Sequence, residues 1–260
     1  MKKLIMIVSL FLAATAQTST LEIKSMSQVL PLITANTLVI FDLDNTIMEP
    51  TQTLGSDQWG MNEIQRFLKA GLREREAKDQ GVGRFAQVQM RTAVQAVEAM
   101  TPRLIHYLQK NKIQVMGLTA RPLSLTLRSA QQLQSLGVDL ATTAPIFNDA
   151  LVSADPSTYF RGILLVGPHN NKGTVLMNFL RMSKVKADRI VFIDDKLSNV
   201  QNVETALNAQ SLPHVGLRYG AADAKVASFN AAIGDIEWKI LTKTGQVIRD
   251  QQAQEILRQH

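Results

Sequence analysis

The chain has 260 residues, 45% of them hydrophobic, and a formal net charge of +6. This is enough for one α/β domain with an accessory element, stabilised by its own core. The absence of cysteine excludes disulfides, thiolate zinc sites and a cysteine nucleophile. The basic residues are dispersed without runs, so a nucleic-acid-binding tract is not indicated, and the positive excess suits an anionic substrate only weakly.

The first sixteen residues have the three parts of a secretory signal peptide. Met1–Lys3 is a basic start, Leu4–Leu12 is an apolar run too short to span a bilayer, and Ala14-Thr15-Ala16 is a small-x-small cleavage site. An uncut membrane anchor is the alternative interpretation. We expect cleavage after Ala16, which leaves 244 residues (260 minus 16) without a membrane anchor. The predicted location is periplasmic or secreted, in a bacterium.

Strands and helices alternate along the remaining chain, residues 17–260. An initial helix is expected within 18–37, and helical periodicity extends over 61–110. A hairpin or irregular structure is expected at 147–160, a second hairpin at 236–248, and a final helix from Asp250. Buried strands are predicted at 38–41, 113–118, 162–167, 189–193 and 214–219, and further helices at 122–136 and from 172. This order predicts an α/β fold with a doubly wound parallel sheet.

Two carboxylates follow the first buried strand directly. Asp42 and Asp44 end the run Leu38–Phe41 and precede Asn45 and Thr46. Ligands of open α/β sheets bind beyond the carboxyl ends of the strands, so both acids should border the site. Because two acids this close repel each other, a cation or a shared proton is expected between them.

Three later positions carry complementary groups at strand ends or helix starts. Thr119 and Arg121 follow the second strand, Lys172 opens a helix, and Asp194-Asp195 ends a later strand. Taken singly, a threonine here is usually a helix cap, a lysine a solvated residue and an acidic pair a turn. Taken together, they supply what phosphoryl transfer needs: a nucleophile, cations for the phosphate oxygens and an acid for the leaving oxygen.

In order and type, these positions resemble the four signatures of the haloacid dehalogenase superfamily. Asp42-Leu43-Asp44-Asn45-Thr46 resembles the first signature, Gly117-Leu118-Thr119 the second, Lys172 the third, and Ile193-Asp194-Asp195 with Asn199 the fourth. The resemblance extends from about Leu38 to Tyr219 and includes an uncharacterised branch of exported members.

The resemblance implies a role for each matched residue. Asp42 would be the nucleophile and Asp44 the acid/base, while Thr119 and Lys172 would bind phosphate. Mg²⁺ would be held by Asp42, the backbone carbonyl of Asp44 and Asp194, with Asp195 acting directly or through water. Arg121 lies outside the matched signatures, and we expect it either to reach the phosphate or a substrate acid or, equally, to pair with a carboxylate of the cap.

The helical stretch at about 50–110 lies where the superfamily inserts a cap over the active site. A cap favours a small phosphorylated substrate, because a lid excludes large ones; a bundle packed to one side is the alternative. Trp59 either closes over the substrate or, more commonly, packs beneath the insertion.

Three functions compete. The first is a Mg²⁺-dependent phosphomonoesterase that forms a phospho-aspartyl enzyme. The second is an exported metal- or ligand-binding protein of the same fold without turnover, which would not need the carboxylate of Asp44. The third is a receiver-type signalling domain, which is disfavoured because its acidic pair would precede a lone acceptor aspartate.

Overall fold

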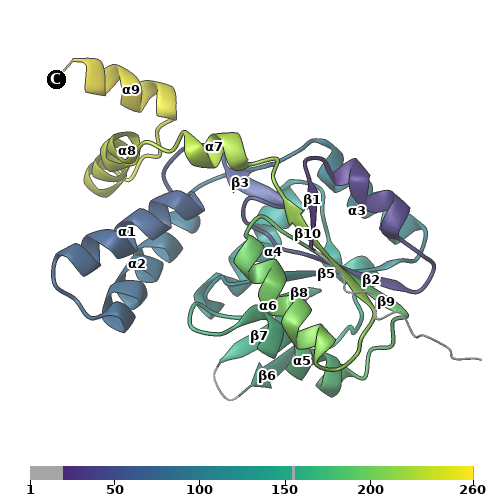
Figure 1. Cartoon of the computed structure of the whole chain (residues 1–260). Coiled ribbons are helices and arrows are strands. Elements are labelled where there is room, and N and C mark those ends of the chain that lie inside the picture. Colours follow the sequence, from purple (N-terminus) through teal and green to yellow (C-terminus); the bar gives the residue numbers. More distant parts are fainter. Residues whose placement is uncertain (1–19, 154–155, 260) are drawn as a thin grey trace, which may run out of the picture.

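The computed structural model describes residues 20–153 and 156–259, so the predicted signal peptide lies outside the described residues (Figure 1). Its centre is an eight-stranded sheet in the order β1-β10-β9-β2-β5-β8-β7-β6. The first six strands of that order run parallel, and β7 and β6 are antiparallel. The bounds are β1 Leu21–Ile23, β2 Thr37–Phe41, β5 Gln114–Thr119, β6 Ala150–Ser153, β7 Ser157–Phe160, β8 Ile163–Leu165, β9 Arg189–Asp194 and β10 His214–Tyr219.

Strand β2 lies inside the sheet between β9 and β5, and all five of its residues are buried. Its side chains alternate between two hydrophobic clusters. Val39 and Phe41 join the cluster on one face, whereas Leu38 and Ile40 join the cluster on the other. An apolar run buried on both faces is typical of a parallel strand covered by helices, which is what the run predicted.

Helices cover both faces of the sheet. The cluster containing Val39 also contains residues of η1 (Met26–Leu32), α3 (Met100–Lys110) and α4 (Thr126–Ser135). The opposite cluster contains residues of α5 (Lys172–Ser183) and α6 (Leu197–Asn208). Short η2 (Leu123–Leu125) and η3 (Leu140–Thr143) complete the sheet domain. The predicted doubly wound α/β fold is confirmed.

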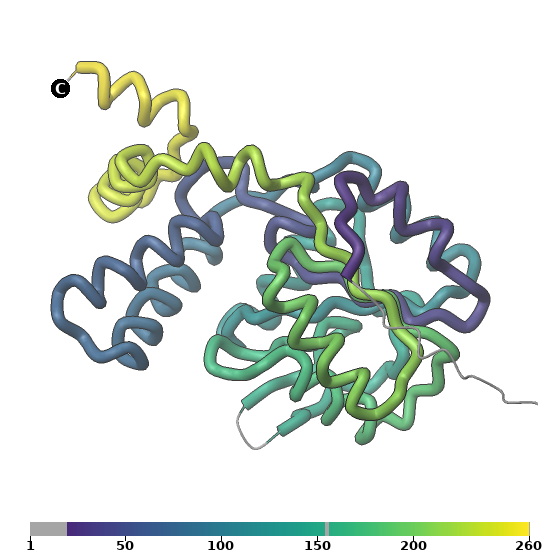
Figure 2. Tube along the Cα trace, viewed as in Figure 1, coloured from purple at the N-terminus to yellow at the C-terminus, as the bar shows by residue number. Residues whose placement is uncertain are grey.

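A helical lobe stands beside the sheet domain (Figure 2). It contains α1 (Asp57–Lys69) and α2 (Glu74–Gln89), joined to the sheet domain through a two-stranded ribbon of β3 (Met48–Pro50) and β4 (Val94–Ala96). The C-terminal helices α8 (Ala231–Thr244) and α9 (Asp250–Arg258) lie in the same lobe, after the short α7 (Asp223–Ala227). The lobe therefore combines two segments that are far apart in the sequence.

Buried contacts join the two segments of the lobe. The rings of Trp59 and Trp238 have centroids 5.7 Å apart. The Glu237 carboxylate accepts a hydrogen bond from the Leu54 backbone N–H at 2.6 Å, and Asp250 accepts one from the Thr53 N–H at 2.6 Å. Trp59 is thus packed inside the lobe.

Three sequence predictions differ from the structure. The hairpin expected at 236–248 is wrong, because α8 begins at an Asn230 cap and ends at Gly245, whose φ of 75° favours glycine. The insertion expected at 50–110 is shorter, since α3 buries Leu104 and Ile105 against the sheet rather than in the lobe. The initial helix is preceded by β1, which pairs with β10.

Other local predictions are confirmed. The hairpin at 147–160 is formed by β6 and β7, and the helix expected within 18–37 is η1, which is capped by Ser25. Among the described residues, none of the helices combines the length and apolar character needed to cross a bilayer.

Candidate active site

The ends of β2, β5 and β9 bring the predicted site residues together. Phe41 is paired with Gly117 on one side and with Ile193 on the other, so Asp42, Thr119 and Asp194 lie at the same edge of the sheet. The Asp42 N–H donates to the Ile193 carbonyl at 2.8 Å, which extends the ladder to the site. This is also the switch point of the fold, because the chain continues from β2 to β5 and β8 on one side and later adds β9 and β10 on the other.

A tight loop after Asp42 holds the first acidic segment. The Leu43 carbonyl accepts hydrogen bonds from the backbone N–H groups of Thr46, Ile47 and Met48. Asn45 has a φ of 60°, a left-handed conformation that asparagine tolerates better than most residues. Its side-chain amide donates to the Asp195 carboxylate at 3.2 Å.

Lys172 links the acids of the first and fourth predicted signatures. It is the first residue of α5, whose N-cap is Asn171, and its side chain is 4% exposed. The ammonium donates to Asp42 at 2.5 Å and to Asp194 at 2.7 Å. Although burial alone would lower the pKa of Lys172, the carboxylates of Asp194 and Asp42 raise it above its usual value, so Lys172 is a cation here.

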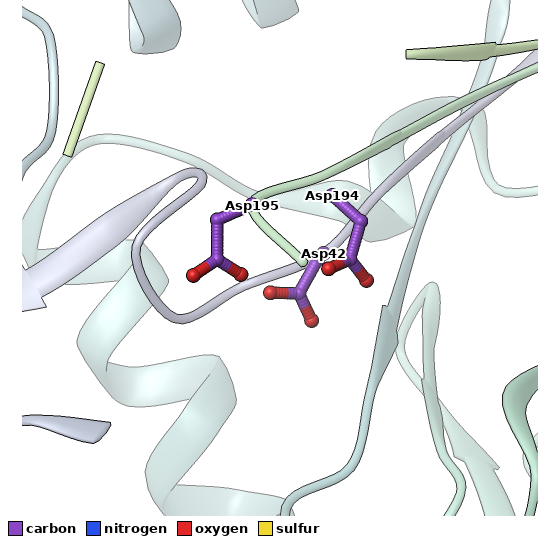
Figure 3. Close-up of side chains that lie close together, drawn as sticks. All are labelled: Asp42, Asp194 and Asp195. Atoms are coloured by element: carbon purple, nitrogen blue, oxygen red, sulfur yellow. The ribbon is translucent and has the colours of Figure 1, made fainter. Parts of the chain in front are cut away.

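Three carboxylates converge on one point. Asp42, Asp194 and Asp195 each offer an oxygen, and these oxygens lie within 4.8 Å of one another (Figure 3). Burial raises the pKa of Asp42 well above its usual value, with Lys172 opposing and the neighbouring acids adding to the shift. Burial and the charge of Asp194 raise the pKa of Asp195 to about 7. One buried ammonium does not balance this cluster, so a divalent cation with a preference for oxygen ligands fits it.

Asp194 is held more firmly than the other two acids. It is fully buried, and its Oδ1 accepts from the Lys196 backbone N–H at 2.8 Å and from the Asn199 amide at 3.1 Å. Asn199 thus orients an acid without belonging to the cluster itself. These bonds fix the direction in which Asp194 faces Asp42.

Asp44 does not join the cluster through its side chain. Its two carboxylate oxygens accept from the Arg121 guanidinium, each at 2.7 Å. Thr119 is buried at the end of β5, and its hydroxyl accepts from the Arg121 backbone N–H at 3.2 Å. All the predicted site residues thus lie in one region, and Arg121 is paired with Asp44 within it.

A cavity of about 220 Å³ lies between this edge of the sheet and the helical lobe. Asp42, Asp44, Thr119 and Lys172 line one side. The lobe lines the other side mainly with apolar side chains, together with one lysine and one aspartate, which are Met61, Ile64, Val82, Phe85, Lys78 and Asp57. Sequence periodicity predicted helices here but not which of their residues face the site, so these lining residues were missed.

One ion pair and one hydrogen bond connect the lobe to the sheet domain at the rim of the site. Lys196, which follows the acidic pair, lies 2.8 Å from Asp57 at the start of α1. His169, which precedes Lys172, lies 2.6 Å from Asp79 on α2. Both pairs are partly exposed, so each contributes on the order of 1 kcal/mol or less.

Curated relatives match most of the chain. A Chlamydia pneumoniae protein named "Putative outer membrane protein" is 22% identical over 251 residues, which are 92% of this chain and 91% of that protein. A second protein of that species and name is 27% identical over 80% of this chain and 78% of its own length. An uncharacterized protein of Rickettsia prowazekii is 23% identical over 90% of this chain and 87% of its own length.

A solved structure and a family model were also found. The structure is a hydrolase of the haloacid dehalogenase-like family from Streptococcus pneumoniae, which is 15% identical, with a TM-score of 0.41 over 67% of this chain and 82% of its own. The model of the protein family of unknown function DUF2608 matches residues 19–254. The chain therefore belongs to the DUF2608 family.

Proposed function

We propose that this protein is an exported, Mg²⁺-dependent phosphoric monoester hydrolase that forms a phospho-aspartyl intermediate on Asp42. One observation carries the proposal: the Asp42 carboxylate faces a cavity and lies between the buried Lys172 ammonium and two further acids. The carboxyl group of Asp44, two residues further along the chain, lines the same cavity. A nucleophile, a cation and an acid/base are the groups that the hydrolysis of a phosphate ester requires.

In the first half of the reaction, an Asp42 oxygen attacks phosphorus and the bond from phosphorus to the leaving oxygen breaks. The carboxyl group of Asp44 gives its proton to that oxygen. In the second half, water attacks the phosphorus of phospho-Asp42 and gives a proton to Asp44. The bond between phosphorus and Asp42 breaks, which restores the carboxylate and releases inorganic phosphate.

Lys172 and Thr119 bind the phosphate oxygens in this mechanism. The Lys172 ammonium has three N–H donors and uses two of them on Asp42 and Asp194, so one remains for a phosphate oxygen. The Thr119 hydroxyl accepts from Arg121 and can donate its proton to the substrate.

Asp42, Asp194 and Asp195 would hold the Mg²⁺, because their oxygens converge and carry more negative charge than Lys172 offsets. When bound, Mg²⁺ would supply positive charge to the phosphate oxygens. The ion would also reduce the repulsion among the carboxylates of the cluster.

The substrate is a small phosphate ester with an apolar body and a second anionic group. The cavity of about 220 Å³ suits a small ligand, and Met61, Ile64, Val82 and Phe85 form its apolar side. Lys78 also lines the cavity, and its ammonium makes no hydrogen bond or ion pair with any residue in 20–153 or 156–259. An unpaired ammonium beside an apolar surface favours an anion at the end of the substrate distant from the phosphate.

The signal-peptide pattern supports export, and the relatives named as outer membrane proteins support an envelope location. N-terminal sequencing of the protein recovered from the producing cell should begin at Gln17. Recovery of intact Met1 in a cytoplasmic pool would contradict export without affecting the proposed chemistry.

The test of the chemistry uses residues 17–260 with 4-nitrophenyl phosphate. We expect turnover with Mg²⁺, none in excess chelator, and a higher melting temperature with Mg²⁺ that Asp194→Asn abolishes. Asp44→Asn should accumulate a hydroxylamine-sensitive acyl phosphate on Asp42, because no base activates water, whereas Asp42→Asn should form none. Asp188→Asn, on the surface, is the matched control.

Two outcomes would reject the proposal. Full turnover in excess chelator would contradict the requirement for Mg²⁺. A phosphoryl label on a residue other than Asp42 would contradict the role of Asp42 as the nucleophile. Metal binding without hydrolysis of any phosphate ester would favour a binding protein without turnover.

A further inference from the structure

The guanidinium of Arg121 is almost fully enclosed, although it adjoins the cavity. Arg121 is 3% exposed and lies two residues after Thr119, where the chain leaves β5. Its Nε donates to Asp44 Oδ2 and its Nη2 to Asp44 Oδ1, each at 2.7 Å. This is a bidentate pair, the geometry in which an arginine fixes both the position and the plane of a carboxylate.

The other donors of Arg121 are also used. Nη1 donates to Ser129 Oγ at 3.1 Å and to Gln132 Oε1 at 2.6 Å, and Nη2 donates to Gln89 Oε1 at 3.3 Å. A guanidinium has five N–H donors, and these contacts together with the two to Asp44 occupy all five. No donor of Arg121 therefore remains for a phosphate oxygen.

Gln89 connects this pair to the helical lobe. It is the last residue of α2 and is fully buried. Its Oε1 accepts from Arg121 and from Gln132 Nε2, the latter at 2.9 Å, while its own Nε2 donates to the Gly55 carbonyl at 2.6 Å. A continuous set of hydrogen bonds thus runs from the lobe through Gln89 and Arg121 to Asp44.

We propose that Arg121 is a positioning residue for Asp44 rather than a phosphate ligand, and that the lobe sets its position through Gln89. This inference rests on the proposed function of Asp44 as the acid/base. Because the Asp44 side chain keeps 17% exposure and lines the cavity, it can exchange a proton there while Arg121 holds its plane. Without Arg121, the carboxyl group is free to rotate away from the leaving oxygen.

The test compares two esters of similar size that differ in their need for an acid. 4-Nitrophenyl phosphate has a leaving group that departs without protonation. The leaving group of 4-nitrobenzyl phosphate is an alkoxide, which needs a proton to depart. We expect Arg121→Met to slow the single-turnover release of nitrobenzyl alcohol by roughly 10²-fold or more. The rate of the nitrophenol burst should change less than about threefold, and phospho-Asp42 should accumulate. The affinity for inorganic phosphate should stay within about twofold of wild type, since no phosphate contact is lost.

Other results would overturn the inference. If Arg121 binds phosphate, both esters lose kcat/KM together and inorganic phosphate binds at least tenfold more weakly. If Arg121 only stabilises the fold, both bursts slow equally and no phospho-enzyme accumulates. Absence of turnover by the wild type on both esters would instead reject the proposed function.

Gln89→Met tests the link to the lobe, with Gln87→Met on the exposed side of the same helix as its control. We expect Gln89→Met to slow the nitrobenzyl reaction relative to the nitrophenyl reaction by about three- to tenfold, because the hydrogen bond from the charged Arg121 to Gln89 is lost. A variant without that preference would limit the positioning role to Arg121 itself and overturn the role of the lobe. Restoration of the Arg121→Met burst with the nitrobenzyl ester by added guanidinium would further support positioning.

Discussion

The carboxyl edge of the sheet and the helical lobe form the two sides of one cavity with different kinds of side chain. At the sheet, Asp42, Lys172 and Asp194 are buried, and the Lys172 ammonium donates a hydrogen bond to each of the two acids. In the lobe, the side chains that line the cavity are apolar except for Lys78 and Asp57, and Asp57 is paired with Lys196. The charged groups that hold one another in place thus lie at strand ends and at the first residue of α5, whereas α1 and α2 present mostly apolar side chains to the cavity.

The comparison predicts that charge removal at the sheet has the largest effect. Lys172→Met leaves two buried carboxylates without their ammonium, so we expect a loss of about 3–5 kcal/mol in the free energy of unfolding. Turnover should fall by roughly 10²–10³-fold, the effect of losing one positioned donor. Urea unfolding and the phosphate assay measure both, with exposed Lys186→Met as control. A midpoint equal to that of the wild type would show that the acids are not charged in the folded protein.

The lobe contains its own buried acid, which gives a pH-dependent prediction. Burial and the nearby Asp250 raise the pKa of Glu237 to about 9. Since this pKa is above the unfolded value, the folded protein binds the proton more tightly. The contribution of Glu237 to stability is therefore fully present below about pH 4.5 and is lost progressively as the pH rises to about 9, at no more than about 1.4 kcal/mol per pH unit.

Glu237→Gln should remove this dependence, because its amide oxygen still accepts from the Leu54 N–H. We expect the variant to gain stability relative to the wild type between pH 6 and pH 9, with little difference at pH 4.5. Melting temperatures across this range measure the effect, and Glu255→Gln on the exposed side of α9 is the control. Parallel curves for wild type and variant would contradict the raised pKa.

The smallest expected effect concerns Lys78. Lys78→Met should lower kcat/KM about tenfold for phosphate esters with a second anionic group, because one charge-assisted contact is lost. Esters without that group should be unaffected or slightly better substrates. Paired assays with an aryl phosphate and its carboxylated analogue measure the difference, with Lys69→Met as control. Equal effects on both esters would exclude Lys78 from substrate selection.

The sequence was most informative where one strand carries both a structural and a chemical signal. The apolar run that ends at Asp42 predicted a central buried strand, and β2 is one. The acids of the first and fourth signatures were expected to share a Mg²⁺, and the oxygens of Asp42, Asp194 and Asp195 do converge. Local pattern and topology together were sufficient for these positions.

Pairings set by tertiary packing were not predictable. Asp44 and Arg121 were both identified, but they are 77 residues apart and nothing in the sequence selects one as the partner of the other. Gln89 carries no signal of its role, since a glutamine on a helix is usually exposed. The C-terminal segment was misread because Lys243, Thr244 and Gly245 suit a turn as well as a helix end, and only packing against Trp59 distinguishes them.

The composition of the lobe from two distant segments has a consequence for the order of folding. Leu54 and Glu237, which bond across the lobe, are 183 residues apart. A chain made from its N-terminus has α1 and α2 long before α8 exists, so the contact between Trp59 and Trp238 can form only when nearly the whole protein has been synthesised. The strands that carry Asp42 and Asp194 can pair earlier, since all six parallel strands precede residue 220. The sheet edge that carries Asp42 and Asp194 can therefore form before the lobe is complete, because the lobe also needs the C-terminal helices α8 and α9.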